Sequence, residues 1–246
     1  MIKQILLPID ASEHSNTAFQ FAASLAKKLK AKINILHVVD MKILAGNFLA
    51  DFGALTGAAP FFNFKKNISS LLEEKSKTLI KIYSEKCRSL KLPFNAESSE
   101  GIVSKKIAQT ALLNDLVVLG QFGENATHSH GLLGSVSENV TRNSKKPVLL
   151  TPQKYRGIKK ILLAYDGSDS AKSALEITSE LASALKLKVD VMTVEESRTG
   201  ASRIIKECTK YLAAYRIKPA IHISSGTPAE ITVSYTHLTL PTKRIV

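Results

Sequence analysis

An internal repeat constrains the fold of this chain more than any other feature of its sequence. Residues 2–40 align without a gap on residues 158–196, at an offset of 156, and match at 14 of 39 positions. Most matched positions carry core-type side chains, but Asp10 and Asp166 also coincide, and burial alone does not require a carboxylate after an apolar run. A chain that repeats itself in this way is expected to form two similar folding units.

Each copy begins with the pattern of a strand, a helix and a second strand. In the first copy, the runs 5–9 and 32–39 are short and rich in β-branched and aliphatic residues, as buried parallel strands are. Between them, apolar residues recur at helical spacing, and Ser12 or Ser15 can cap the start of that helix. The pattern predicts a right-handed βαβ unit.

The rest of the first copy continues this alternation. The expected helices are 69–90, 102–113 and 135–143, and the expected strands are 93–98, 116–119 and 147–150. The prediction is therefore an α/β domain over residues 1–152, with a doubly wound sheet of five parallel strands. The apolar but interrupted segment 41–67 is interpreted as a surface arm of this domain rather than a membrane span.

The second copy is shorter than the first. Gly226 aligns with Gly101 at an offset of 125, so about 31 residues that correspond to the arm and its surroundings are missing. We expect a second, truncated domain over residues 158–231, and hence a tandem repeat with an incomplete second copy. Residues 232–246 resemble the translation of a transposase sequencing adaptor and are interpreted as a non-native tail, with a native β-rich tail as the alternative.

Composition narrows the class of protein. With 34 basic and 21 acidic residues the net charge is +13, but it divides almost evenly between the copies, and no aromatic residues interleave with the densest lysine runs. These features favour a solvated basic surface over a nucleic-acid or membrane partner. The two cysteines, Cys87 and Cys208, are predicted to be buried free thiols in a cytoplasmic protein.

The chemistry is expected where the fourth strand of the first copy ends. Gly120 and Gly123 lie at the strand exit, and Gly134 precedes a helix that begins with Ser135 and contains Ser137. Glycines let backbone N–H groups approach an anion, and a helix N-terminus adds free donors and a positive dipole end. The pattern is neither a P-loop nor the dinucleotide fingerprint, and the first strand is not followed by the Ser-Gly-Gly run of adenylating pyrophosphatases.

These segments together resemble the universal stress protein family in its tandem-domain form. The resemblance covers nearly all of residues 2–231 and is carried by the runs 5–12, 36–40, 115–120, 131–140 and 146–150. It implies the adenine nucleotide alpha hydrolase-like form of the doubly wound fold. The family's ATP-binding members carry Gly-x2-Gly-x9-Gly-Ser/Thr, and here the second spacing, from Gly123 to Gly134, is ten residues.

The resemblance also implies a ligand and its site. Asp10 and the backbone of Val38 would hold the adenine and ribose side of ATP, which binds alone or with Mg²⁺, and Leu119 would pack beside the base. The phosphates would be surrounded by Gly120, Gly123, Gly134, Ser135, Val136 and Ser137. Simpler interpretations stay open, since Val38 and Leu119 fit a plain core, the glycines fit turn geometry, and Asp10 can cap the following helix.

The expected function is that of an ATP-binding regulatory or protective stress protein, not an enzyme, with at most slow ATP hydrolysis. His128 and His130 lack a third ligand with metal-site spacing, and His37 is interpreted as a satisfied core histidine. The resemblance further implies pairing of such domains within the chain or in a homodimer. The alternatives are an interaction module of the same fold that binds no nucleotide and, third, an adenylating enzyme.

Overall fold

The computed structural model describes residues 1–40, 58–124 and 133–239; the side chains of residues 58–66, 198 and 236–239 are not described. The chain divides into two compact units, Met1–Arg156 and Gly157–Val246, here called unit 1 and unit 2. Each unit is an α/β structure built on a parallel sheet.

Unit 1 contains the predicted five-stranded parallel sheet. Its strands have the order β3-β2-β1-β4-β5. Their bounds are β1 (Gln4–Ile9), β2 (Lys32–Asp40), β3 (Phe94–Gly101), β4 (Leu116–Gly120) and β5 (Val148–Thr151). From β1, the chain adds β2 and β3 on one side of the sheet and then β4 and β5 on the other, so the strand order switches between β1 and β4. Open α/β sheets bind ligands at such a switch point, at the carboxyl ends of their strands.

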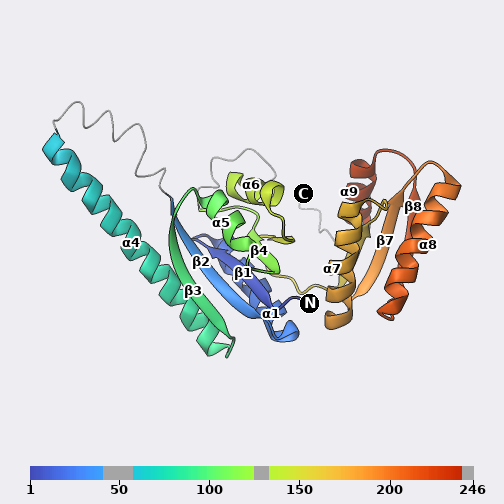
Figure 1. Cartoon of the computed structure of the whole chain (residues 1–246), viewed down its shortest axis with the longest axis horizontal. Helices are drawn as coiled ribbons and strands as arrows, with labels where there is room; N and C mark the ends of the chain where they lie inside the picture. Colours follow the sequence, from blue (N-terminus) through green and yellow to red (C-terminus); the bar gives the residue numbers. More distant parts are fainter. Residues whose placement is uncertain (41–57, 125–132, 240–246) are drawn as a thin grey trace. The chain divides into compact units, whose positions relative to one another are not determined.

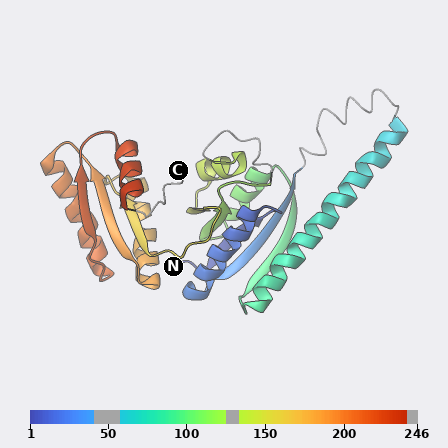
Figure 2. The ribbon, with the colours of Figure 1, turned by 180° about the vertical axis from the view of Figure 1, so that it is seen from behind.

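The helices described in unit 1 cover the two faces of this sheet (Figure 1, and from behind in Figure 2). They are α1 (Glu13–Leu29), α4 (Ala58–Ser89), α5 (Val103–Ala111) and α6 (Ser135–Asn143). Phe19 of α1 packs against Tyr83 of α4 on one face, whereas α5 and α6 pack on an apolar cluster of the other face. The amino-terminal turns of α4 project beyond the edge of the sheet in both views.

The central strands form the core because they are buried on both faces. Ile5, Leu6 and Leu7 of β1 are consecutive and fully buried, as an apolar run in a parallel strand requires. Full burial of one such side chain is worth about 1.5–3 kcal/mol. Helix α1 begins where the Ser12 side chain accepts a hydrogen bond from Ser15 N, and it ends at Lys30, which adopts the left-handed conformation.

Unit 2 is a three-stranded parallel sheet of order β6-β7-β8. Its strands are β6 (Lys160–Ala164), β7 (Lys188–Val194) and β8 (Ala220–Ser224), and its helices are α7 (Asp169–Leu185), α8 (Arg198–Ala214) and α9 (Pro228–Thr239). Helices α7 and α8 share an apolar cluster with the sheet, which contains Leu175, Val191 and Leu212. Helix α9 contacts β7.

Unit 2 is a partial repeat of unit 1. Ile5 pairs with Ile33 in unit 1, and Ile161 pairs with Val189 in unit 2, so the register of the first two strands is the same in both copies. Helix α7 repeats the caps of α1, with a serine side chain at its start and a left-handed lysine at its end. Gly101 and Gly226, which precede α5 and α9, both have a positive φ.

The structure differs from the sequence-based prediction mainly in the segment between β2 and β3. The helix predicted over 69–90 begins eleven residues earlier, at Ala58, because Pro60 falls in its first turn, where proline is tolerated. Of the segment 41–67 that was interpreted as an arm, residues 41–57 lie outside the described residues and residues 58–67 belong to α4. The other predicted helices and strands agree with the structure to within three residues.

The boundary expected near residue 231 lies inside helix α9. The helix continues to Thr239, and Tyr235 donates a hydrogen bond to Asp190 over 2.7 Å. Residues 240–246 lie outside the described residues. The domain bounds 1–152 and 158–231 and the non-native origin of the tail stay predictions.

Both cysteines are buried and free, as predicted. Burial raises the pKa of the Cys87 and Cys208 thiols to about 11, so neither is a reactive thiolate near neutral pH.

Candidate functional site

Asp10 ends β1 and forms a compact turn into α1. Its Oδ1 accepts hydrogen bonds from the backbone N–H of Ser12, over 2.9 Å, and from the Ser12 hydroxyl. The backbone N–H of Asp10 donates to Ser15 Oγ over 3.1 Å. Asp10 therefore does not cap the helix itself; one of its two carboxylate oxygens holds Ser12, which is the N-cap residue of α1.

The second oxygen of Asp10 faces the glycine-containing loop after β4. Asp10 Oδ2 accepts a hydrogen bond of 3.0 Å from the backbone N–H of Glu124, a residue 114 positions away in the sequence. A Cβ atom on Gly123 would lie 3.0 Å from the same oxygen. The absence of a side chain at position 123 therefore lets the loop approach the carboxylate.

Gly120 is required by packing against α1. A Cβ atom at this position would lie 2.7 Å from His14 Cβ, a distance that real Cβ atoms essentially never show, and 3.0 Å from the carbonyl carbon of His14. Its carbonyl accepts a hydrogen bond of 2.8 Å from the buried hydroxyl of Ser137 in α6. Gly120 and Ser137 thus fix the exit of β4 against two helices.

Gly134 closes the loop on its own first residues. Its N–H donates to the carbonyl of Gln121 over 2.9 Å, and a Cβ atom here would lie 3.3 Å from Phe122 Cα. The intervening residues 125–132, which include His128 and His130, lie outside the described residues. The two described ends of the loop are nevertheless held side by side by this contact.

Helix α6 directs its amino terminus to the same loop. Gly134 is its N-cap residue and supplies no side-chain cap. Ser135 is exposed, and its carbonyl accepts a hydrogen bond from Asn139. Within the described part of the chain, the first-turn amides of α6 donate to no side chain, so they are the kind of donors that bind anions.

The remaining predicted site residues belong to the apolar cluster on the α5–α6 face. Val38 and Leu119 are each 9% exposed, and Val136 packs against them at the margin of the cluster. Their side chains therefore serve the core in this structure, as the simpler interpretation held. The structure brings Asp10, Gly120, Gly123, Gly134 and Ser137 together around the loop.

Helix α4 adds a lysine that the sequence analysis did not include. Lys75 Nζ donates to both carboxylate oxygens of Glu124, over 2.6 and 2.7 Å. The two side chains are 41% and 44% exposed. Nothing in the local sequence marks Lys75, because the contact depends on how α4 lies across the sheet.

Next to Lys75 in α4, Ser76 belongs to a polar chain that is buried at His37 and Ser76 and reaches the exposed Ser98. His37 Nδ1 is 2.9 Å from Ser76 Oγ, which is 2.7 Å from Ser98 Oγ. His37 is thus the satisfied core histidine that was predicted. Burial lowers its pKa below 6.5, the Lys75 ammonium lowers it further, and the carboxylates of Asp10 and Glu124 act in the opposite direction.

Unit 2 repeats the aspartate turn without the loop. Asp166 accepts a hydrogen bond of 2.9 Å from Ser168 N, and the hydrogen bonds from Ser168 lower its pKa. The described residues of unit 2 include no counterpart of β4 and α6.

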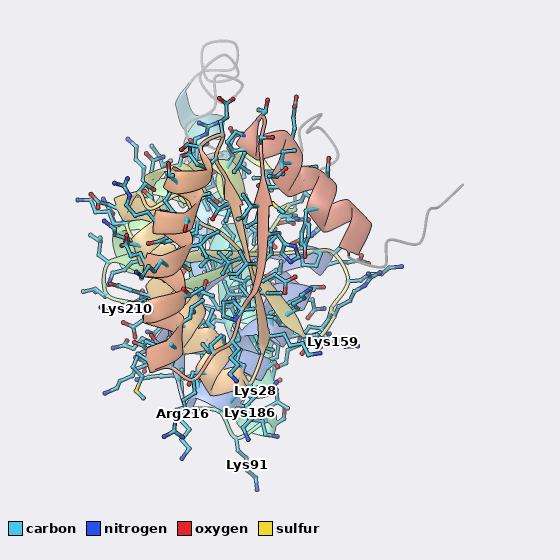
Figure 3. The ribbon with its side chains drawn as sticks, turned by 90° about the vertical axis from the view of Figure 1, so that its right-hand side faces the viewer. Lys28, Lys91, Lys159, Lys186, Lys210 and Arg216 are labelled. Carbon is cyan, nitrogen blue, oxygen red and sulfur yellow. The ribbon has the colours of Figure 1, made fainter. Side chains whose placement is uncertain are left out.

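A cavity of about 480 Å³ in unit 2 lies at the other end of the sheet, near the amino ends of β7 and β8. Its lining includes Lys186 and Arg216, which are labelled in Figure 3, as well as Lys188 and Lys218. Lys186 is the C-cap of α7 and Arg216 follows the C-cap of α8, so these cations complement helix dipoles.

Comparison with known proteins decides the family. The model of the universal stress protein family matches residues 1–60 and 69–152. The chain belongs to this family. Among curated relatives, the universal stress protein Slr1230 of Synechocystis is 27% identical over 248 residues, which covers 95% of this chain and 85% of that protein.

Two solved structures of the family are similar to this one. The universal stress protein structure from Archaeoglobus fulgidus aligns with a TM-score of 0.72 at 21% identity, over 96% of this chain and 83% of that chain. The structure of MJ0577, a universal stress protein of Methanocaldococcus jannaschii, aligns with a TM-score of 0.52 at 26% identity and covers 63% of this chain and 99% of that chain. Both confirm the fold predicted from the sequence.

The described residues contain neither a candidate membrane span nor a candidate metal site. None of their helices combines the length and apolarity that crossing a bilayer requires. They also contain no group of three or more His, Cys, Asp or Glu side chains placed to hold a metal ion.

Proposed function

We propose that unit 1 binds ATP between the Asp10 turn, the loop after β4 and the amino terminus of α6, and that the chain acts as a nucleotide-responsive regulatory or protective stress protein. The observation that carries the proposal is the contact of Asp10 Oδ2 with the backbone N–H of Glu124. It joins the end of β1 to the loop after β4, at the switch point of the sheet.

The residues present fit a nucleotide. Gly123 lets the loop approach the Asp10 carboxylate, and Gly134 lets the start of α6 approach the backbone of Gln121 and Phe122. The first turn of α6 offers N–H donors for phosphate oxygens. Asp10 would accept hydrogen bonds from the adenine and ribose side, next to the backbone of Val38 and to Leu119. Magnesium, if it accompanies ATP, would add positive charge beside the phosphates.

The proposed chemistry is binding rather than turnover. His37 and Ser76 are the one histidine–serine contact of the described site, and they are only 7% and 3% exposed, so they do not face a ligand. The cytoplasmic location, the pairing of domains within the chain or in a homodimer, and the lack of an enzymatic activity stay predictions from the sequence.

One observation favours a second candidate, an interaction module of this family that binds no nucleotide. Both oxygens of Asp10 already have partners within the chain, and Glu124 already engages Lys75. If this arrangement were permanent, the loop would be a structural closure and not a binding site.

Isothermal titration of the full chain with ATP separates the two candidates. The proposed function predicts saturable binding of one ATP per chain, a loss of about tenfold or more in affinity for Asp10→Ala, and no change for Asp166→Ala. Asp166→Ala is the matched control, because it removes the same turn from unit 2. Binding by neither the wild type nor Asp166→Ala would overturn the proposal and leave the interaction module.

A further inference from the structure

Helix α4 supplies polar contacts to three segments of the proposed site. Lys75 engages Glu124 of the loop, Ser76 contacts His37 at the end of β2, and the hydroxyl of Tyr83 donates to Ser15 Oγ over 3.2 Å. Ser15 in turn accepts the backbone N–H of Asp10. The helix therefore supports the residues around the proposed site from within the core, and its exposed Lys75 lies at the loop.

The charges at the loop are unbalanced for a polyphosphate. The Asp10 carboxylate accepts the backbone N–H of Glu124, and Lys75 is a cation in contact with the Glu124 carboxylate. The described loop residues 120–124 and 133–134 include no lysine or arginine. An anion that binds beside these carboxylates needs a positive partner to offset their charge. Lys75 is available for this role because it already contacts Glu124, the residue after Gly123.

The geometry allows Lys75 to change partners. Its Nζ contacts both oxygens of one carboxylate, which is also how an ammonium engages two oxygens of a phosphate. Both side chains of the pair are more than two-fifths exposed, so exchange of one anion for another costs little desolvation. Lysine is a flexible point charge with rotatable donors, suited to such an exchange.

We propose that Lys75 is the phosphate-binding cation of this site and that Glu124 is an internal competitor that occupies it when no nucleotide is bound. This inference rests on the proposed function. The expected ligands are nucleoside di- and triphosphates. Their affinity should rise with each added phosphate charge that the ammonium can bind, and the phosphate must displace Glu124 from Lys75.

Titration with adenosine, AMP, ADP and ATP tests this assignment on the full chain. Lys75→Met is expected to weaken ATP binding about tenfold, ADP binding less and adenosine binding not at all. Glu124→Gln is expected to strengthen ATP binding about threefold, with an effect that shrinks at high salt. Lys77→Met and Glu73→Gln are the matched controls, since this exposed pair lies on the same helix and contacts no site residue, and both should bind like the wild type.

The double variant Lys75→Met with Glu124→Gln distinguishes direct binding from mere neutralisation of Glu124. If Lys75 binds phosphate, the double variant binds ATP about tenfold more weakly than Glu124→Gln alone. Equal affinities of these two variants would overturn the inference, as would unchanged ATP binding by Lys75→Met or an equal loss for adenosine and ATP. No ATP binding by the wild type would overturn the proposed function and this inference with it, whereas wild-type binding with an indifferent Lys75→Met overturns the inference alone.

Discussion

The two aspartate turns of this chain are nearly the same structure with different surroundings. Asp10 and Asp166 both follow the first strand of their unit, both accept the N–H of a serine two residues later, and both serines cap the next helix. Among the described residues, Asp10 also has a partner in a distant segment, the backbone N–H of Glu124, and Asp166 has no such distant partner. The turn thus positions the cap of the next helix in both units, and in unit 1 it also contacts the loop after β4, where the proposed site lies.

The sequence repeat and the proposed site are therefore separate properties of the chain. The repeat covers strand, helix and strand, which need one another for burial. The proposed site also needs β4 and α6 of unit 1, which lie outside the repeated segment. The residues that the two copies share are therefore not enough to identify the site.

The largest expected effect is on the stability of unit 1. Gly120→Ala places a Cβ atom 2.7 Å from His14 Cβ, so α1 or β4 must shift at a cost of about 1–3 kcal/mol. Gly157→Ala is the control, because no atom lies within 4 Å of its added Cβ, and its cost should stay within about 0.5 kcal/mol. Hydrogen exchange of the β1 and β4 amides reports unit 1 alone; equal exchange in the two variants would show that α1 does not pack on Gly120 in this way.

The next effect concerns the opening of the two units. Cys87 in α4 and Cys208 in α8 are both fully buried, and burial raises the pKa of both thiols to about 11, so each reacts only when its unit opens. Unit 1 has five strands covered on both faces, whereas the described part of unit 2 has three, and fewer buried contacts mean easier opening. We expect Cys208 to be alkylated at least about ten times faster than Cys87, as measured by mass spectrometry of the labelled peptides. In concentrated urea the two rates should converge; faster labelling of Cys87 in the native chain would reverse the comparison.

The smallest effect is a pH dependence restricted to unit 1. Position 193 of unit 2, equivalent to His37, is a threonine whose hydroxyl donates to the carbonyl of Tyr165. Because the folded pKa of His37 lies below its unfolded value of about 6.5, the unfolded chain binds the proton first, and the stability of unit 1 falls as the pH drops from about 6.5 toward the folded pKa. Urea midpoints between pH 5 and pH 8 should show this slope in the wild type and a flatter one for His37→Gln. The same slope in both proteins would assign the dependence to another group.

The parts of the fold that could be predicted from the sequence are those set by periodicity. The run from Ile5 to Ile9 and the stripe of Ala18, Ala22 and Leu25 are buried as their spacing indicates. The start of α4 was missed because Pro60 is a breaker within a helix but not in its first turn. The local sequence alone could not show whether Pro60 ends a helix or lies in the first turn of one.

The site was only partly predictable, because its decisive contacts join residues far apart in the sequence. Glycines after a buried strand indicated the loop, but the reason for Gly120 is the close approach of His14, which no motif records. Lys75 and Glu124 are separated by 49 residues and meet only because α4 lies on β2 and β3. A spacing rule for phosphate loops finds residues near one another in sequence and omits such partners.

The central claim is that unit 1 alone is the nucleotide-binding unit, and hydrogen exchange of the full chain with and without ATP tests it most directly. The account predicts slower exchange in the presence of ATP at Gly120–Glu124 and in the first turn of α6, with no change from Asp166 to Lys172 of unit 2. Unchanged exchange throughout unit 1 at saturating ATP, or protection confined to the Asp166 turn, would contradict it.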